Sequence, residues 1–194
     1  MREEILMAAQ RITDTYRAGG KLLLCGNGGS CADCDHIVGE LMKGFLLKRP
    51  LPESLLEKFQ ADFGAAGLSV GESLQQGLPA ISLAAHPALL TAFSNDVNPE
   101  LIYAQQVLGY GRPGDLLIGI STSGNAGNVA AALMTAKALG IATLGLTGRG
   151  GGKMAGLCDL CLKAPASETY RVQEYHIVLY HFLCAYTESE MFDE

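Results

Sequence analysis

The chain has 194 residues, a formal net charge of −6, 48% hydrophobic residues and 18% charged residues. This length is typical of a single domain with a sizeable core, and this composition excludes a disordered chain. The negative charge disfavours broad nucleic-acid binding, which needs a basic face, but it is compatible with a small anionic ligand held by a few local donors.

The amino-terminal segment, MREEILMAAQ, is charged and amphipathic, unlike a secretory signal peptide. No run of the sequence approaches the roughly 20 apolar residues of a membrane span. We therefore expect a cytoplasmic protein that does not enter a membrane, and we expect its six cysteines to be reduced thiols.

Helices and strands are expected to alternate along the chain. Apolar residues at three- and four-residue steps predict a helix over 2–18, which the AGG that follows interrupts. Short apolar runs predict strands over 21–26, 79–85, 114–121, 141–148 and 158–165. Helical patterns lie between and after them, over 30–46, 86–96, 99–111, 126–140 and 167–192.

The segment 50–77 is ambiguous. Residues 51–63 have a helical pattern, whereas 64–79 read as a loop with one helical turn. The rest predicts an α/β fold: a doubly wound, open, parallel five-stranded sheet flanked by helices, in a flavodoxin-like three-layer sandwich. We expect one domain over 1–194, in which 1–20 is an amino-terminal helical part and 50–77 an insertion near the site. Ligands of such sheets bind at the carboxyl ends of the strands.

Two strand-to-helix turns carry Gly, Asn and hydroxyl residues that can bind a phosphate. They contain Asn27, Gly28, Gly29 and Ser30, and then Ser121, Thr122 and Ser123. Backbone N–H groups at a helix start attract anions, and hydroxyl groups add donors, although helix capping alone also favours these residue types. A nucleotide is disfavoured, because a Walker A lysine is absent and Cys31 stands where the dinucleotide motif needs its third glycine.

Four polar residues on two predicted helices form a candidate metal-ligand set. His36 and Glu40 are four residues apart and share a helix face, whereas Gln173 and His181 are eight apart, about 80° around their helix. The alternative is a solvated His–Glu pair and hydrogen-bonded structural histidines. Imidazole, carboxylate and amide groups suit Zn²⁺ or a similar divalent ion, but spacing alone does not join the two helices.

Two CxxC pairs, Cys31/Cys34 and Cys158/Cys161, raise the alternative of a four-thiolate zinc site. Residues three apart on a strand point to opposite faces, so the predicted strand over 158–165 disfavours this site. Buried free thiols are the expected role of these cysteines.

Several motifs resemble the sugar isomerase (SIS) domain and, more closely, the phosphoheptose isomerases. They are CGNGGSCADCDHIVGEL, AFSND, GDLLIGISTSGN, LGLTGRGGGKMAG and RVQEYHIVLYH. The resemblance runs from about Lys21 to the carboxyl terminus, apart from 50–77. It implies isomerisation of sedoheptulose 7-phosphate to D-glycero-D-manno-heptose 7-phosphate through an enediol, in a homotetramer whose sites use neighbouring subunits.

The same resemblance assigns roles to individual residues. Glu40 would be the catalytic base and His181 the acid, and one zinc or similar divalent ion per site would be held by His36, Glu40, Gln173 and His181. The sugar phosphate would contact Asn27, Gly28, Gly29, Ser30, Asn95, Asp96, Ser121, Thr122, Ser123 and Gln173.

This sequence departs from the family pattern at four places. Ala126 replaces a serine, Tyr170 an aspartate and Lys43 an arginine, and the segment 50–77 is inserted. Two alternatives therefore stay open: a non-catalytic SIS module that binds a phosphosugar or a protein, and an isomerase of another sugar phosphate.

Overall fold

The structure, a computed structural model, describes residues 2–192. It contains one parallel five-stranded sheet with the strand order β2-β1-β3-β4-β5. The strands are β1 (Leu22–Gly26), β2 (Ala80–Ser82), β3 (Leu116–Ser121), β4 (Ala142–Thr147) and β5 (Leu160–Lys163). This order is that of flavodoxin-like sheets, so the predicted fold class is confirmed.

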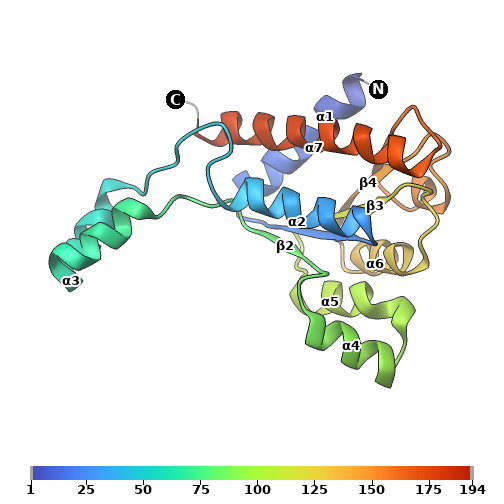
Figure 1. The fold of residues 1–194 in the computed structure, drawn as a ribbon, viewed down its shortest axis with the longest axis horizontal. Coiled ribbons are helices and arrows are strands. Elements are labelled where there is room, and N and C mark those ends of the chain that lie inside the picture. Colours follow the sequence, from blue (N-terminus) through green and yellow to red (C-terminus); the bar gives the residue numbers. More distant parts are fainter. Residues whose placement is uncertain (1, 193–194) are drawn as a thin grey trace.

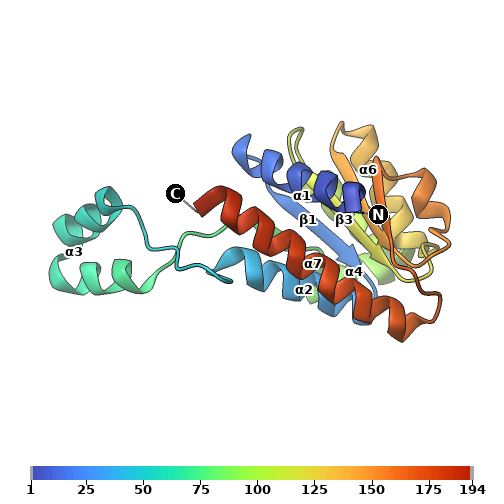
Figure 2. The ribbon, with the colours of Figure 1, turned by 90° about the horizontal axis from the view of Figure 1, so that it is seen from above.

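Helices cover both faces of the sheet (Figures 1 and 2). They are α1 (Arg2–Arg17), α2 (Gly29–Met42), α3 (Glu53–Ser73), α4 (Pro87–Asp96), α5 (Ile102–Tyr110), α6 (Gly127–Ala138) and α7 (Thr169–Phe192), with 3₁₀ turns η1 (Pro99–Leu101) and η2 (Lys153–Gly156). None of the helices in this described part of the chain is long and apolar enough to cross a membrane.

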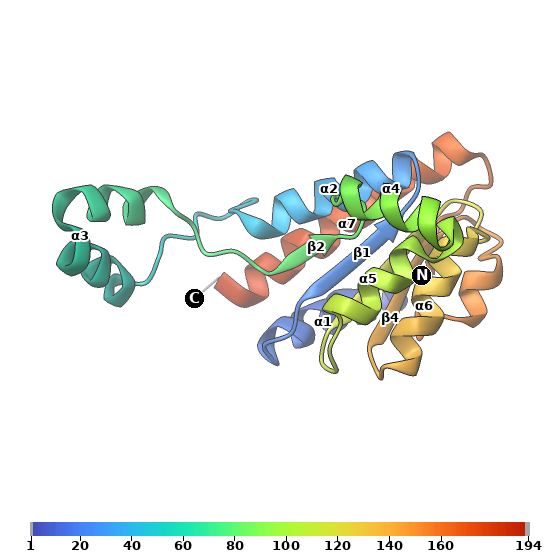
Figure 3. The ribbon, with the colours of Figure 1, turned by 90° about the horizontal axis from the view of Figure 1, so that it is seen from below.

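Alternate residues of β1 belong to two separate cores, which explains its uninterrupted apolar sequence. Leu22 and Leu24 pack among residues of α1, α2 and α7, whereas Leu23 and Cys25 pack toward α5 and α6. Both faces of the strand are thus buried, as in other parallel sheets. Figures 2 and 3 show these opposite sides, with α1, α2 and α7 over one face and α5 and α6 over the other.

The segment after α2 differs most from expectation. Residues 64–73 are helical, so the prediction of a loop with only one helical turn over 64–79 was wrong for this part. Helix α3 is a pair of helices that reverses at Gly64, whose φ of 63° suits glycine. Gly67 packs closely against Phe59, and Gly71 against Leu56, so the two halves pack on each other. Figure 3 shows this helical hairpin projecting away from the sheet and its helices.

Several other elements are shorter than predicted, α2 and β5 among them. Helix α2 ends at Met42 rather than at residue 46, because Lys43 turns to an extended conformation. Strand β5 begins at Leu160 rather than at residue 158, so Cys158 lies in the bend that precedes it.

Candidate active site

Three of the predicted ligands converge between α2 and α7. His36 and Glu40 lie on α2, and His181 comes from α7, which packs along it. Nε2 of His36 lies 3.0 Å from Oε1 of Glu40 and 3.4 Å from Nε2 of His181. One ligand atom from each residue lies within 4.8 Å of the others. Two imidazole nitrogens and a carboxylate oxygen form the donor set of many catalytic zinc sites, so the trio fits a divalent metal.

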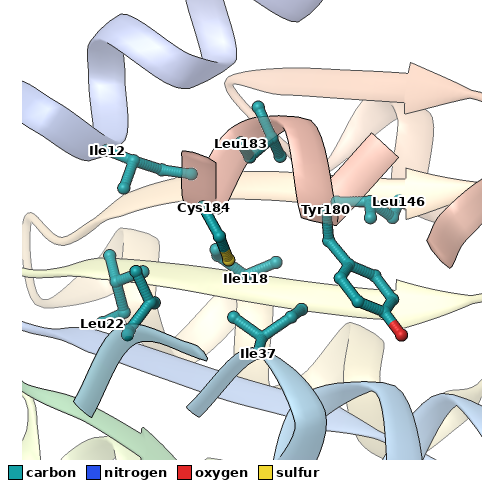
Figure 4. Close-up of a pocket in the computed structure, with 9 residues that line it drawn as sticks. Ile12, Leu22, Ile37, Ile118, Leu146, Tyr180, Leu183 and Cys184 are labelled. Atoms are coloured by element: carbon teal, nitrogen blue, oxygen red, sulfur yellow. The ribbon is translucent and has the colours of Figure 1, made fainter. Parts of the chain in front are cut away.

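The other nitrogen of His36 contacts a buried tyrosine. Nδ1 of His36 lies 2.9 Å from the hydroxyl of Tyr180, which donates a hydrogen bond to Oδ1 of Asp33 at 3.3 Å. The tyrosine ring lies among Ile37 and Leu146 in the core, with its hydroxyl at the margin of that apolar region (Figure 4). Burial raises the pKa of Asp33 although Tyr180 and His36 oppose the change. Packing of the Tyr180 ring in the core therefore determines where its hydroxyl contacts Nδ1 of His36.

Glu40 is held by contacts to both its side chain and its backbone. Its Oε2 lies 3.2 Å from Nζ of Lys43, which is exposed, while Oε1 faces His36. Arg49 donates hydrogen bonds to the carbonyl oxygens of Glu40 at 3.3 Å and of Leu41 at 2.7 Å. These carbonyls end a helix and lack helical partners, so Arg49 satisfies them and anchors the last turn of α2.

Arg49 is in turn paired with a carboxylate from α7. Oε1 of Glu188 accepts a hydrogen bond from Arg49 at 2.7 Å and one from the backbone N–H of Phe45 at 2.8 Å, and Oε2 accepts from Leu46 at 2.6 Å. Both side chains of the ion pair are almost completely buried. This buried pair therefore connects the end of α2, below Glu40, to the helix that carries His181.

Gln173, the fourth predicted ligand, lies elsewhere in this structure. Its side-chain amide packs against Gly29 at the start of α2, in space that a Cβ on Gly29 would need. Eight residues of helix separate it from His181, which corresponds to about 12 Å along α7. The structure thus joins three of the four predicted ligands and places Gln173 beside the first glycine-rich turn.

The two predicted phosphate-binding turns lie next to each other at the carboxyl end of the sheet. The side-chain amide of Asn27, in the first turn, exchanges hydrogen bonds of 2.8 and 3.0 Å with Asn128, which lies in α6 after the second turn. Gly28 has a φ of 56°, and Ser30 is buried in the first turn of α2. The pairing of Asn27 with Asn128 fixes the spacing of the two turns.

The second turn is held by the loop that follows β4. Gly124, with a φ of 68°, packs directly against Gly151 and Gly152. The backbone N–H of Gly148 donates to the carbonyl of Thr122 at 2.9 Å, and that of Met154 donates to the carbonyl of Gly124 at 3.0 Å.

Within this second turn the three hydroxyl residues differ in exposure. Ser121 is buried, Thr122 is half-buried and Ser123 is exposed. The turn therefore presents hydroxyl groups at the same edge of the sheet as the start of α2.

Asn95 and Asp96 lie at the exposed end of α4. Their side chains form a hydrogen bond of 2.8 Å with each other. Helix α4 packs mainly on η1 and α5. Within residues 2–192, Asn95 and Asp96 are therefore not part of the cluster formed by His36, Glu40 and His181.

Sequence reasoning missed the residues that support the trio. Asp33 and Tyr180 each lie next to a predicted feature, since Tyr180 precedes His181 and Asp33 is one turn before His36 on α2. Arg49 borders the segment whose structure the sequence left ambiguous. A polar residue at a position that the helical pattern predicts to be buried was the available signal for Asp33.

The four-thiolate alternative is not supported. Among residues 2–192, the side chains that lie close enough together to hold a metal ion are those of His36, Glu40 and His181. This group contains no cysteine. The reason given from sequence was wrong for Cys158, however, because that residue precedes the strand.

Comparison with known proteins identifies the family. The SIS domain matches residues 75–185, and a second SIS domain description matches 1–75. The phosphoheptose isomerase of Roseiflexus sp. (strain RS-1) is 42% identical over 190 residues, covering 98% of this chain and 83% of that protein. That of Aneurinibacillus thermoaerophilus is 40% identical over 194 residues, with coverages of 98% and 85%.

Solved structures agree with this result. Phosphoheptose isomerase GmhA from Neisseria gonorrhoeae has a TM-score of 0.78 and 33% identity, and the match covers 96% of this chain and 86% of that one. A phosphoheptose isomerase from Francisella tularensis has a TM-score of 0.79 and 28% identity, with the same coverages. The chain therefore belongs to the SIS-domain family and, within it, to the phosphoheptose isomerases.

Proposed function

We propose that this protein interconverts sedoheptulose 7-phosphate and D-glycero-D-manno-heptose 7-phosphate, as an aldose–ketose isomerase that works through an enediol. The convergence of His36, Glu40 and His181 carries the proposal, because it brings a carboxylate base, an imidazole acid and a candidate metal site together. The two hydroxyl- and glycine-rich turns, held together by Asn27 and Asn128, are the proposed phosphate site.

In this mechanism Glu40 removes the proton from C1 of the ketose, next to the carbonyl carbon C2. The imidazole of His181 gives a proton to the C2 oxygen and takes one back from the C1 hydroxyl as the C1 carbonyl forms. The proton on Glu40 exchanges with solvent at the enediol stage, and Glu40 then gives one proton to C2, so that no proton is gained or lost overall. Asn95, Asp96 and Gln173 are proposed to contact the sugar.

We propose that His36, Glu40 and His181 hold zinc or a similar divalent cation, one per site, with Gln173 as a fourth ligand after its side chain moves. Such an ion, when bound, polarises the carbonyl and stabilises the negative charge that develops on its oxygen. The two oxygens of Glu40 already face different partners, His36 and Lys43. One oxygen is thus available to the metal while the other takes up the proton.

We further propose a homotetramer built from single SIS domains over 1–194, with 50–77 as an insertion. Exposed apolar side chains support self-association: Val178 and Phe182 on α7, Met7 on α1, and Phe63 and Val70 on α3. Light scattering coupled to size-exclusion chromatography measures the assembly state.

The test of the proposed reaction uses metal-free and zinc-loaded protein with sedoheptulose 7-phosphate and a panel of pentose and hexose phosphates. We expect turnover of the heptose only, solvent deuterium at the product carbon next to the carbonyl, and loss of both in Glu40→Gln and His181→Ala. Glu57→Gln, which removes an exposed carboxylate on α3, is the matched control and should retain activity. Binding without turnover would instead support a non-catalytic module, and turnover of another sugar would reassign the substrate.

A further inference from the structure

Two cysteines outside the candidate active site lie close together near the edge of the sheet. Cys161 lies on β5, and Cys158 lies in the bend before it. The sulfur of Cys158 is 2.7 Å, and that of Cys161 3.2 Å, from the position that a Cβ on Gly145 would occupy. Both thiols therefore reach the same point over β4, and only a glycine at position 145 leaves room for the two sulfur atoms.

The surroundings of the pair make its two sulfurs chemically different. A hydrogen bond from the thiol of Cys158 lowers the pKa of Cys161 to about 6, with help from Thr147 and Lys163 and against the effect of burial. The hydroxyl of Thr147 lies 3.5 Å from that sulfur. The same hydrogen bond, together with burial, raises the pKa of Cys158. The opposite directions of these two pKa shifts make Cys161 the better nucleophile of the pair and Cys158 the thiol that keeps its proton.

A metal site explains this pair less well than redox chemistry does. Structural zinc takes four protein ligands, and two thiols supply only half of them. Among residues 2–192, the side chains grouped closely enough to hold a metal do not include either cysteine. Both residues are half-buried, so each keeps some contact with solvent.

We propose that Cys158 and Cys161 form a redox-active dithiol that a low-molecular-weight disulfide, such as oxidised glutathione, converts into an intramolecular disulfide. The Cys161 thiolate attacks one sulfur of the reagent, forms a mixed disulfide and releases one thiol equivalent. The Cys158 thiol then loses its proton and attacks the sulfur of Cys161, which releases the second thiol. The protein loses two hydrogen atoms and two electrons, and the reagent gains them.

Closure of this disulfide acts on the second phosphate-binding turn through a short chain of contacts. The backbone N–H of Cys158 donates to the carbonyl of Met154 at 3.0 Å, and the N–H of Met154 donates to the carbonyl of Gly124 at 3.0 Å. On the other side, Cys161 contacts Thr147, which directly precedes Gly148 and its bond to Thr122. Formation of a bond between the two sulfurs therefore shifts Met154 and Gly148, the two residues whose backbone N–H groups donate hydrogen bonds to the Ser121–Asn125 turn.

The experiment uses the full chain in glutathione buffers of graded redox ratio, quenched with acid, alkylated and analysed by mass spectrometry. We expect wild-type protein to lose two hydrogen atoms and two alkylatable thiols, with one cross-link between Cys158 and Cys161 that dithiothreitol reverses. Cys158→Ser should stop at a glutathione adduct on Cys161, and Cys161→Ser should form no cross-link. Cys31→Ser removes another half-buried thiol and should oxidise like the wild type.

Separate glutathione adducts on wild-type protein, or a cross-link to any other cysteine, would overturn the dithiol. Amide hydrogen exchange over 121–125 tests the coupling, and we expect it to change on oxidation in wild-type protein but not in Cys158→Ser. Equal exchange in both redox states would refute the coupling. Neither measurement depends on isomerase activity, so failure of the proposed reaction leaves this test intact.

Discussion

The hydroxyl oxygen of Tyr180 lies 2.9 Å from Nδ1 of His36, and the same hydroxyl donates its only proton to Asp33. When a metal ion binds at Nε2, which faces Glu40 and His181, Nδ1 would carry the ring proton and donate it to the tyrosine oxygen. The contact thus stabilises the tautomer of His36 that can bind a metal.

We therefore predict that Tyr180→Phe weakens zinc binding by roughly 10- to 100-fold, the usual effect of losing a hydrogen bond that orients a ligand. Calorimetric titration of metal-free protein with zinc measures the affinity directly. Tyr186→Phe removes a tyrosine hydroxyl on the same helix, bonded to Gln10 at 3.4 Å, and should leave the affinity unchanged. Equal zinc affinity in Tyr180→Phe and wild-type protein would show that the contact does not orient His36.

Loss of Glu188 should destabilise the whole domain. Replacing it by alanine leaves Arg49 as a buried, unpaired cation, and breaking such a pair costs about 3–5 kcal/mol of unfolding free energy. Urea denaturation measures the loss. Glu190→Ala is the control on the same helix: its pair with Arg17 is exposed, so the expected loss is below about 1 kcal/mol. Similar losses in both variants would argue against a structural role for the buried pair.

The same residue predicts how stability depends on pH. Burial on its own raises the pKa of Glu188, but hydrogen bonds from Phe45, Leu46, Leu47 and Arg49 outweigh it, and the pKa is lowered. A lowered pKa gives stability that is fully present above the carboxyl's ordinary pKa and is lost as pH falls through the folded-state value. We expect the unfolding free energy of Glu188→Gln to depend less on pH below about pH 4.5 than that of wild-type protein.

Gly124→Ala should separate substrate binding from folding. A Cβ at this position meets the backbone of Gly151 and Gly152, so the turn that presents Ser121 to Ser123 must move. We expect KM for the sugar phosphate to rise roughly tenfold, which corresponds to about 1.4 kcal/mol of binding energy. Gly140→Ala has a similar positive φ but open space around its Cβ, so it controls for backbone strain alone. An equal rise in KM in both variants would contradict the proposed role of the turn.

Replacing residues 52–74 by a short Gly-Ser linker should leave the sheet domain folded. Helix α3 packs on itself, and the ends of the hairpin are already joined by a backbone bond of 2.7 Å from Gln76 to Arg49 and a bridge between Pro50 and Gln75. We expect the circular dichroism of the variant to equal that of wild-type protein once the lost helical residues are subtracted. We expect light scattering to show fewer subunits in its assembly. An unfolded product would mean that the hairpin supports the domain itself.

The sequence was most informative where local pattern determines structure. The apolar run of β1 and the four-residue spacing of His36 and Glu40 predicted a buried parallel strand and a shared helix face, and both are present. Pattern could not show that His181 meets His36, because that contact depends on how two helices distant in the chain pack. The family resemblance supplied the pairing instead.

The remaining differences have the same physical origin. Arg49 ends α2 through a partner 139 residues later in the chain, which no local window reveals. Gly64, Gly67 and Gly71 read as loop residues, yet the latter two let the halves of α3 approach closely. Cys158 was assigned to a strand that begins two residues later, so the shared position of the two sulfurs over Gly145 was hidden.

The packing of α2 against α7 has a consequence for synthesis. Helix α2, which carries His36, leaves the ribosome before α7, which carries His181, and strands β2 to β5 lie between them in the sequence. The glycine-rich turn before α2 is therefore synthesised well before His181. The proposed metal site is complete only when α7 docks on α2, so uptake of a metal ion would report on that docking.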